Sequence, residues 1–139
     1  MPKKIALDSQ FFDNAYYPIY WLDQDARVVY ANKSACKELG YTEVEMRHLT
    51  LYDLDPEADT LKWEQSLAGI TSGTLTYIET TQRRKDGSEF PVRASLSSAG
   101  VGDDIYICSI LRNITLERQA QQRQAYLEFA VETPWMQFS

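Results

Sequence analysis

The chain has 139 residues, 44% of them hydrophobic and 24% charged, with a formal net charge of −6. This composition is typical of one soluble globular domain and excludes disordered, collagenous and membrane-spanning chains. The negative charge argues against nucleic-acid binding, because affinity for phosphate groups depends on clusters of Lys and Arg.

The first elements expected in chain order are a lead-in segment over residues 1–10 and then a β-hairpin. Residues 18–22 and 26–31 are rich in aromatic and β-branched side chains. Asp23-Gln24-Asp25 lies between them and is typical of a turn. The pattern predicts two short antiparallel strands.

Three helices are expected next. Asn32 is a good N-cap for residues 33–39, and Gly40 allows the left-handed conformation at which many helices end. Residues 42–45 read Thr-Glu-Val-Glu, which has the form of a capping box and predicts a second short helix. Residues 55–71 are expected to form a third helix, capped by the aspartate at its start and with proline at its first position.

The second half of the domain is expected to be three antiparallel strands. Residues 74–83 and 89–98 alternate between polar and apolar side chains, and Asp86-Gly87 between them is a strong hairpin signal. A second turn is expected over residues 99–104. Residues 105–114 follow as the most hydrophobic strand of the chain.

A final helix is expected over residues 116–132, because this segment is rich in Gln, Glu, Arg, Ala and Leu and contains no Gly or Pro. Thr115 is placed to cap it. Four residues follow coiled-coil spacing, with Arg123 at one position of the seam: Leu116, Ala120, Leu127 and Ala130. Pairing with a second helix and packing back on the same domain are equally compatible with this pattern.

Five different short motifs follow one another along the chain in a characteristic order. They are Tyr30-Ala31-Asn32, Leu39-Gly40-Tyr41, Leu54-Asp55-Pro56, Arg84-Lys85-Asp86-Gly87 and Arg112-Asn113-Ile114-Thr115. In order and spacing they resemble motifs of the PAS domain family over about residues 11–117. The resemblance implies an α+β PAS fold, in which a five-stranded antiparallel sheet carries short helices on one face and continues into a C-terminal exit helix. It divides the chain into a sensor domain at 11–115 and a signalling helix at 116–132.

Between a sheet and helices that cover one of its faces, a concave apolar pocket is able to form. In the PAS family this pocket is the ligand site. The residues that the resemblance places there are Leu39, Leu49, Trp63, Leu67, Ile78, Val92, Ala94, Leu96, Ser109 and Leu111. The expected ligand is a small molecule that is largely apolar or mixed in character. A core filled entirely by side chains is the alternative.

Further side chains are expected to give that pocket its chemistry. Trp63, Trp21 and Tyr77 are expected to supply flat aromatic contacts. The side chains expected to supply hydrogen bonds are Thr76, Thr80, Ser95 and Ser109.

The segment Arg112, Asn113, Ile114 and Thr115 resembles the family's junction between the last strand and the exit helix. The resemblance implies that this junction relays a signal from the pocket to the helix. Here Asn113 stands where the family has Asp. An amide keeps the hydrogen-bonding shape and loses the charge, so we expect an ion pair at this junction to be weakened or replaced.

The cofactor is unknown from the sequence, but two candidates fit poorly. Haem-binding relatives carry a histidine on the long helix, where this chain reads Lys62-Trp63-Glu64, and its one histidine, His48, precedes a short segment elsewhere. Relatives that bond flavin covalently need a cysteine on a central helix, whereas Cys36 lies on the first. Neither cysteine has the spacing of a metal site, so no metal is expected.

The resemblance implies a regulatory module of a signal-transduction protein, of the kind found in histidine kinases and cyclic-dinucleotide enzymes. Its expected partners are a second copy of the chain and a downstream effector domain, with residues 133–139 as a linker or a docking tail. The module itself is not expected to be an enzyme, because its carboxylates fall in turns, caps and helix faces. No apolar run is long enough to span a membrane, and a cytoplasmic location is expected. A dimerisation module without a ligand is the alternative function.

Overall fold

The computed structural model describes residues 13–71 and 76–132, and within them five strands form a single antiparallel sheet. The strands are β1 (Ile19–Leu22), β2 (Val28–Ala31), β3 (Thr76–Arg83), β4 (Glu89–Val101) and β5 (Asp104–Asn113). Their order across the sheet is β2-β1-β5-β4-β3, so the last strand lies at the centre. The predicted lead-in at 1–10 and linker at 133–139 lie outside the described residues.

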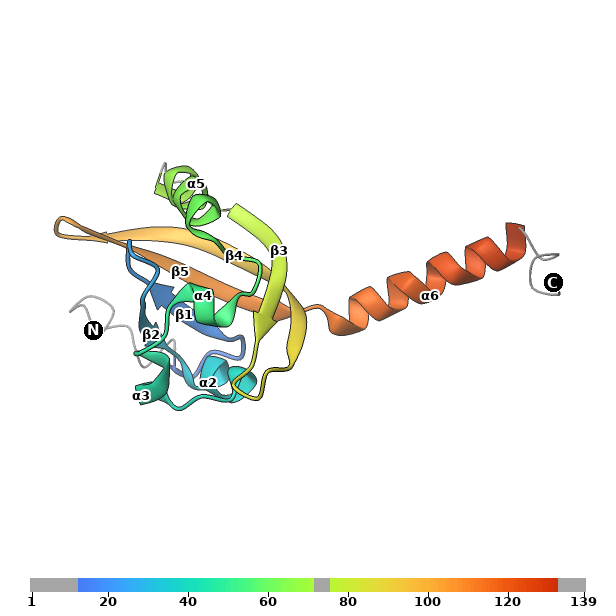
Figure 1. Cartoon of the computed structure of the whole chain (residues 1–139), viewed down its shortest axis with the longest axis horizontal. Helices are drawn as coiled ribbons and strands as arrows, with labels where there is room; N and C mark the ends of the chain where they lie inside the picture. Colours follow the sequence, from blue (N-terminus) through green and yellow to red (C-terminus); the bar gives the residue numbers. More distant parts are fainter. Residues whose placement is uncertain (1–12, 72–75, 133–139) are drawn as a thin grey trace.

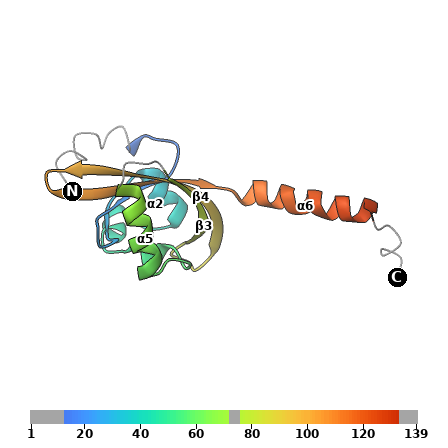
Figure 2. The ribbon, with the colours of Figure 1, turned by 90° about the horizontal axis from the view of Figure 1, so that it is seen from above.

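The helices between β2 and β3 cover one face of this sheet. They are α2 (Lys33–Leu39), α3 (Glu43–Met46), α4 (Leu51–Leu54) and α5 (Thr60–Thr71). Figure 1 shows the long β4–β5 hairpin running behind them, and Figure 2 shows α2 and α5 on the same side of the strands. The face toward these helices is called the inner face below. The predicted α+β architecture is confirmed.

The core forms where the alternation of each strand points apolar side chains at the helices. The buried residues that the strands contribute to the inner face include Tyr20, Leu22, Val92, Ala94, Leu96, Ile107 and Leu111. The helices contribute Ala35, Leu39, Met46, Leu54, Trp63 and Ile70. Each fully buried Leu or Ile side chain stabilises the fold by about 1.5–3 kcal/mol. This single cluster fixes the helices on the sheet.

The predicted caps of the first two helices are confirmed. Asn32 precedes α2 and its side chain accepts from the backbone N–H of Ala35 at 2.8 Å, while Gly40 ends the helix with a φ of 82°. Thr42 and Glu45 form both hydrogen bonds of a capping box at α3. Glu45 also pairs with Lys85 of the β3–β4 loop at 2.6 Å, so a local cap is tied to the neighbouring hairpin.

The prediction of one helix over residues 55–71 is wrong at its start. Asp55 ends α4 with extended backbone angles, because the ring of Pro56 disfavours helical geometry in the residue before it. The long helix α5 begins five residues later, where Asp59 accepts from the N–H of Lys62 at 2.8 Å. Asp55 is therefore released from the cap role that the sequence predicted for it.

The turn predicted over residues 99–104 is also too long. β4 continues to Val101, which pairs with Asp104 across a two-residue turn of Gly102 and Asp103. Gly102 takes a φ of 64°, which the first position of such tight hairpin turns requires and glycine supplies without strain. The hairpin is thus two full strands that extend past the helices (Figure 1).

The last helix, α6 (Thr115–Glu132), leaves the domain at the end of β5 and extends away from it in both views (Figures 1 and 2). Its side chains from Leu116 to Phe129 are exposed. The exposed large apolar residues on it are Leu116, Tyr126, Leu127, Phe129 and Val131. The alternative in which this helix packs back on its own domain is therefore wrong, because its apolar side chains are exposed to solvent.

Candidate functional site

A cavity lies between the inner face of the sheet and the helices α4 and α5. The alternation of β3 places Ile78, Thr80 and Gln82 on the inner face. The register of the sheet sets Ile78 opposite Ala94. The wall of the cavity thus follows from the two-residue period of the strands and from the antiparallel register.

The cavity has a volume of about 300 Å³, at the small end of the range of sites for small molecules. Its lining residues come from four strands, from α4 and α5 and from the loop between these helices. They are Tyr20, Leu22, Leu51, Asp55, Glu57, Ala58, Lys62, Trp63, Gln65, Ser66, Ile78, Glu79, Thr80, Gln82, Ala94, Leu96 and Ser109.

One part of the lining is apolar and rigid. Trp63 is buried in α5, and its indole N–H donates to the main-chain oxygen of Gln24 at 2.9 Å, which fixes the plane of the ring. Leu22, Ile78 and Leu96 line the same cavity from three strands. These side chains offer a flat aromatic surface and branched aliphatic surfaces to the hydrocarbon part of a ligand.

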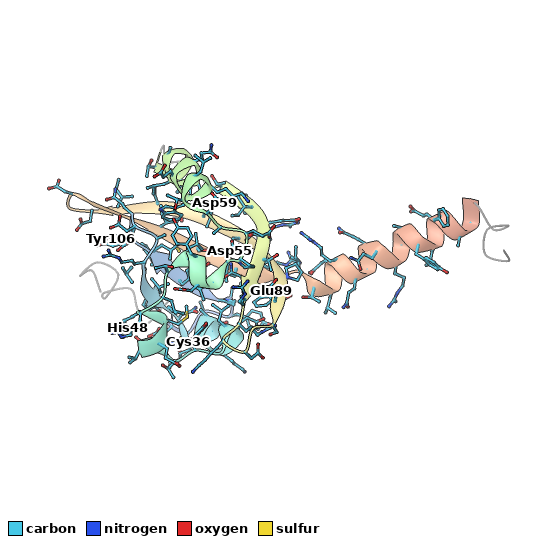
Figure 3. The ribbon with its side chains drawn as sticks, viewed as in Figure 1. Cys36, His48, Asp55, Asp59, Glu89 and Tyr106 are labelled. Carbon is cyan, nitrogen blue, oxygen red and sulfur yellow. The ribbon has the colours of Figure 1, made fainter. Side chains whose placement is uncertain are left out.

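The other part of the lining is polar and centres on Asp55, whose side chain is buried between α4 and β3 (Figure 3). Its carboxylate accepts from the N–H of Glu57 at 2.8 Å and from the hydroxyl of Thr80 at 2.8 Å. Burial raises the pKa of Asp55, whereas these two hydrogen bonds act in the opposite direction. The direction of the shift shows that desolvation dominates.

A second polar group lies deeper against the sheet. The hydroxyl of Tyr20 donates to the side-chain oxygen of Gln82 at 3.2 Å, and both residues are buried. Burial raises the pKa of Tyr20, so this phenol keeps its proton across the physiological range and remains a hydrogen-bond donor. Ser109, also buried, lines the cavity from the central strand β5.

The residues predicted for the pocket divide into two groups. Those on the cavity wall are Trp63, Ile78, Ala94, Leu96 and Ser109. Leu39, Val92 and Leu111 are almost completely buried in the core cluster, and Leu49 and Leu67 are partly buried against it. Inward direction, which a strand pattern predicts, does not distinguish a residue beside the void from one that is enclosed by other side chains.

Several of the predicted chemical contributors lie elsewhere. Trp21 belongs to a separate apolar cluster on the opposite face of the sheet, and Tyr77 is 62% exposed. Ser95 is opposite Tyr77 in the register and shares its face. Thr80, by contrast, is on the cavity wall as expected.

The polar lining formed by Asp55, Tyr20 and Gln82 was not predicted from the sequence. The alternation that selected Ile78 also selects Gln82, four residues further along the same strand, and that signal was available. A role for Asp55 in the cavity was not predicted, because the sequence pattern around this residue is fully explained by a helix cap.

The junction of β5 with α6 is built on Asn113. Its side-chain oxygen accepts from the N–H of Thr115 at 2.9 Å and from the hydroxyl of Thr115 at 2.6 Å. Its side-chain nitrogen donates to Glu38 of α2 at 3.1 Å. Glu38 also pairs with Arg84 at 3.2 Å. In this chain the amide of Asn113 caps the exit helix and donates to the carboxylate of Glu38. An Asp side chain at this position would instead repel Glu38.

Two ion pairs join the first turns of α6 to the sheet. Arg112 at the end of β5 pairs with Glu117 at 3.0 Å. Arg118 pairs at 3.0 Å with Glu79 of β3, whose other carboxylate oxygen is 2.9 Å from Arg93. Glu79 also lines the cavity, so the start of the helix is connected to both the central and the edge strand of the cavity wall.

The cysteine and histidine side chains, which could act as nucleophiles or metal ligands, do not line the cavity. Cys36 is half-buried and Cys108 is buried, and burial raises the pKa of Cys108 to about 11, so its thiol stays protonated at neutral pH. His48 is exposed just after α3. Among residues 13–71 and 76–132 there is no cluster of three or more residues able to hold a metal, and no helix there is long and apolar enough to cross a membrane.

Comparison with known proteins gives matches over the same part of the chain. The model of the PAS domain family matches residues 17–116. The sensor histidine kinase TmoS of Ectopseudomonas mendocina is 30% identical over 115 residues, which are 80% of this chain and 12% of that protein. The chain therefore spans about an eighth of the length of this curated relative.

Two crystal structures illustrate the likeness of the fold. The PAS domain of an HTR-like protein from Haloarcula marismortui is 26% identical, with a TM-score of 0.70 over 81% of this chain and 96% of that one. A domain of a sensory box sensor histidine kinase/response regulator from Geobacter sulfurreducens is 24% identical, with a TM-score of 0.65 over 79% and 94% of the two chains.

Proposed function

This chain belongs to the PAS domain family, and from that premise we propose that it binds a small molecule in the cavity and relays its presence through α6. PAS domains are sensory modules of signal-transduction proteins. The observation that supports binding is the cavity of about 300 Å³, which joins an apolar wall to buried hydrogen-bonding groups.

The relay rests on the connection between the cavity wall and the exit helix. Ser109 lines the cavity on β5, and Asn113 caps α6 four residues later on the same strand. A ligand that contacts Ser109 or β3 biases the position of strands to which the start of the helix is bonded. Such a ligand shifts the helix only by its difference in affinity for the two positions.

The output of the relay is proposed to be a separate effector. Sensor histidine kinases are among the matched proteins, and this chain corresponds to 12% of TmoS. We therefore place the module within, or beside, a longer signalling protein, in a cytoplasmic setting. Haem and covalently bonded flavin remain disfavoured by the sequence reasons given above.

Dimerisation is supported by a separate observation, the exposed apolar side chains of α6. Leu116 is 78% exposed and Leu127 is 51% exposed, on a helix that extends into solvent. Exposed apolar residues at coiled-coil spacing are typical of helices that pair. We propose a homodimer through α6, and a module that only dimerises is the second candidate function.

Native mass spectrometry of the purified domain tests both candidates, since it reports retained small molecules and the number of chains. We expect a dimer with a bound small molecule. Replacing Ala94 with Leu fills the cavity from β4 and should abolish the retained mass without changing the dimer. Ala68→Leu is the matched control, because Ala68 is exposed on α5 and is not part of the lining.

A dimer whose mass never exceeds that of two chains, in both the wild type and Ala68→Leu, would favour the module that only dimerises. For the relay, we expect ligand to change amide hydrogen exchange in the first turns of α6. Unchanged exchange there with a bound ligand would contradict transmission through this helix.

A further inference from the structure

The polar part of the cavity carries an excess of negative charge. Three acidic residues border it, Asp55, Glu57 and Glu79, while Lys62 is the single basic residue among the described lining residues. Glu79 is neutralised by Arg93 and Arg118. The charges of Asp55 and Glu57 are therefore the ones that lack compensation.

The nearby cation does not neutralise these two groups. The ammonium group of Lys62 donates to the main-chain oxygen of Glu57 at 3.1 Å, and among the described residues it forms no ion pair with either carboxylate. Thr80 is between them, since its hydroxyl is 2.8 Å from Asp55 and 3.3 Å from Glu57. Two acidic groups thus share one neutral donor.

Asp55 is the more constrained of the pair, because its side chain is buried whereas that of Glu57 is exposed. A carboxylate has about four acceptor positions, and the hydrogen bonds from Glu57 and Thr80 leave some of that capacity for a ligand. A buried carboxylate without a cation is costly, and burial here raises the pKa of Asp55. A positively charged donor in the cavity would remove that cost.

The rest of the lining suits the body of such a ligand. Trp63 presents an aromatic ring whose plane is fixed by its bond to Gln24, and aromatic faces attract organic cations. Leu22, Ile78 and Leu96 provide aliphatic surface on the sheet side. The volume of about 300 Å³ limits the ligand to a small molecule.

We propose that the cavity selects a small organic amine, with its ammonium group hydrogen-bonded to Asp55 and its apolar body between Trp63 and the sheet. This inference rests on the proposed sensory function and adds the chemical class of the ligand. A carboxylate ligand would face repulsion from Asp55 and Glu57, and a neutral ligand would leave Asp55 uncompensated. The charges in the cavity therefore discriminate between ligands that have similar shapes and different charges.

The test uses three probes that share a 2-phenylethyl group: 2-phenylethylamine, 2-phenylethanol and 3-phenylpropionate. Binding to the whole chain at neutral pH is followed by ¹⁵N NMR shifts and by the fluorescence of Trp63, with a Trp63→Phe variant to assign that signal. We expect the amine to bind at least about tenfold more tightly than the alcohol, because loss of a buried charge partner is worth that much or more. The carboxylate should be the weakest of the three.

The variants separate the charge of Asp55 from charge in general. Asp55→Asn keeps an oxygen that accepts from Glu57, so the loop before α5 is preserved. This variant should bind the amine at least about tenfold more weakly than the wild type does, with little change in its affinity for the alcohol. Asp59→Asn is the matched control, because Asp59 caps α5 and is not part of the lining, and Asn caps as well as Asp. Figure 3 labels the two aspartates, Asp55 beside α4 and Asp59 beside α5.

The outcomes distinguish this inference from the sensory function beneath it. Equal binding of the amine and the alcohol, unchanged in Asp55→Asn, would overturn the selection of amines and leave a ligand-binding module. Absence of binding by all three probes at millimolar concentration would overturn both the amine class and the proposed pocket. Since the amine-to-alcohol ratio is measured in the wild type, the result does not depend on how the variants fold.

Discussion

Asn32 shows how one side chain joins two elements of this domain. It is completely buried, and its side-chain oxygen accepts from the N–H of Ile19 in β1 and from that of Ala35 in α2. Its side-chain nitrogen donates to the main-chain oxygen of Tyr17 at 3.0 Å. An amide supplies an acceptor and a donor on two separate atoms, whereas the carboxylate of Asp has no donor at neutral pH and the hydroxyl of Ser carries both on one atom. The cap of α2 is therefore also a tie to the sheet.

Glu45 combines a cap with an ion pair in a similar way. The hydrogen bonds and charge of Lys85, together with the N–H of Thr42, lower the pKa of Glu45 from 4.5 to about 2. An acid whose pKa is lower in the folded state contributes stability above its unfolded pKa and loses it as the pH falls toward its folded pKa. The contribution of Glu45 should therefore disappear between about pH 4.5 and about pH 2.

The measurement compares urea unfolding of the wild type and Glu45→Gln across that pH window. Gln retains the side-chain oxygen that the capping box uses, so the substitution removes the charge and the pair with Lys85. The wild type should be the more stable protein at pH 6, and the two should converge as the pH is lowered. A difference that is independent of pH would contradict an electrostatic role for this residue.

At the scale of elements, the β4–β5 hairpin determines where the sensor ends and the helix begins. β4 pairs with both β3 and β5, and β5 also pairs with β1. The central strand thus carries hydrogen bonds on both edges from Ile107 to Ile110 before it reaches Asn113. A displacement of this strand is transmitted to four others and to the start of α6.

The two-residue turn of this hairpin gives a stability test with an internal control. Gly102 has a φ of 64° and open space around the position of a Cβ atom. Gly102→Ala should therefore lower the free energy of unfolding by about 1 kcal/mol, through backbone strain alone. Gly69 lies within α5, also with open space, and Gly69→Ala should gain about 0.5–1 kcal/mol. Urea unfolding of both variants measures the two effects. Equal changes in stability would show that the turn does not constrain Gly102.

At the scale of the whole molecule, the domain consists of a folded sensor and one unsupported helix. The side chains of α6 from Leu116 to Phe129 are exposed, while the first turns of the helix are bonded to β3 and β5. Most of the stability of a helix in a protein comes from packing of its apolar face and not from intrinsic propensity. Pairing with α6 of a second copy would bury its exposed apolar side chains and would give the module a symmetric output.

This arrangement predicts a gain of function for Arg123, which interrupts the coiled-coil stripe. Arg123→Leu should tighten dimerisation about tenfold, since burial of a leucine side chain contributes about 1.5–3 kcal/mol. Gln121→Leu adds the same side chain outside the stripe and should have little effect. Sedimentation equilibrium measures both, and an unchanged dissociation constant for Arg123→Leu would show that α6 pairs through another face or not at all.

The sequence by itself determined the five strands, the helices α2 and α3 and the exit helix, because the signals involved act over a few residues, whereas the short helix α4 was not predicted. The cap at Asn32, the capping box from Thr42 to Glu45 and the two-residue period of the strands are all local, and together with the family motifs they specify the sheet and its helices.

Only the tertiary structure decided which inward residues border a cavity and how α6 is placed. Asp55 meets Thr80 across 25 residues, and Tyr20 meets Gln82 across 62. Such contacts depend on how distant elements pack, which no local pattern encodes. The same reason explains why Asp55 was predicted as a helix cap and is instead a buried carboxylate on the wall of the cavity.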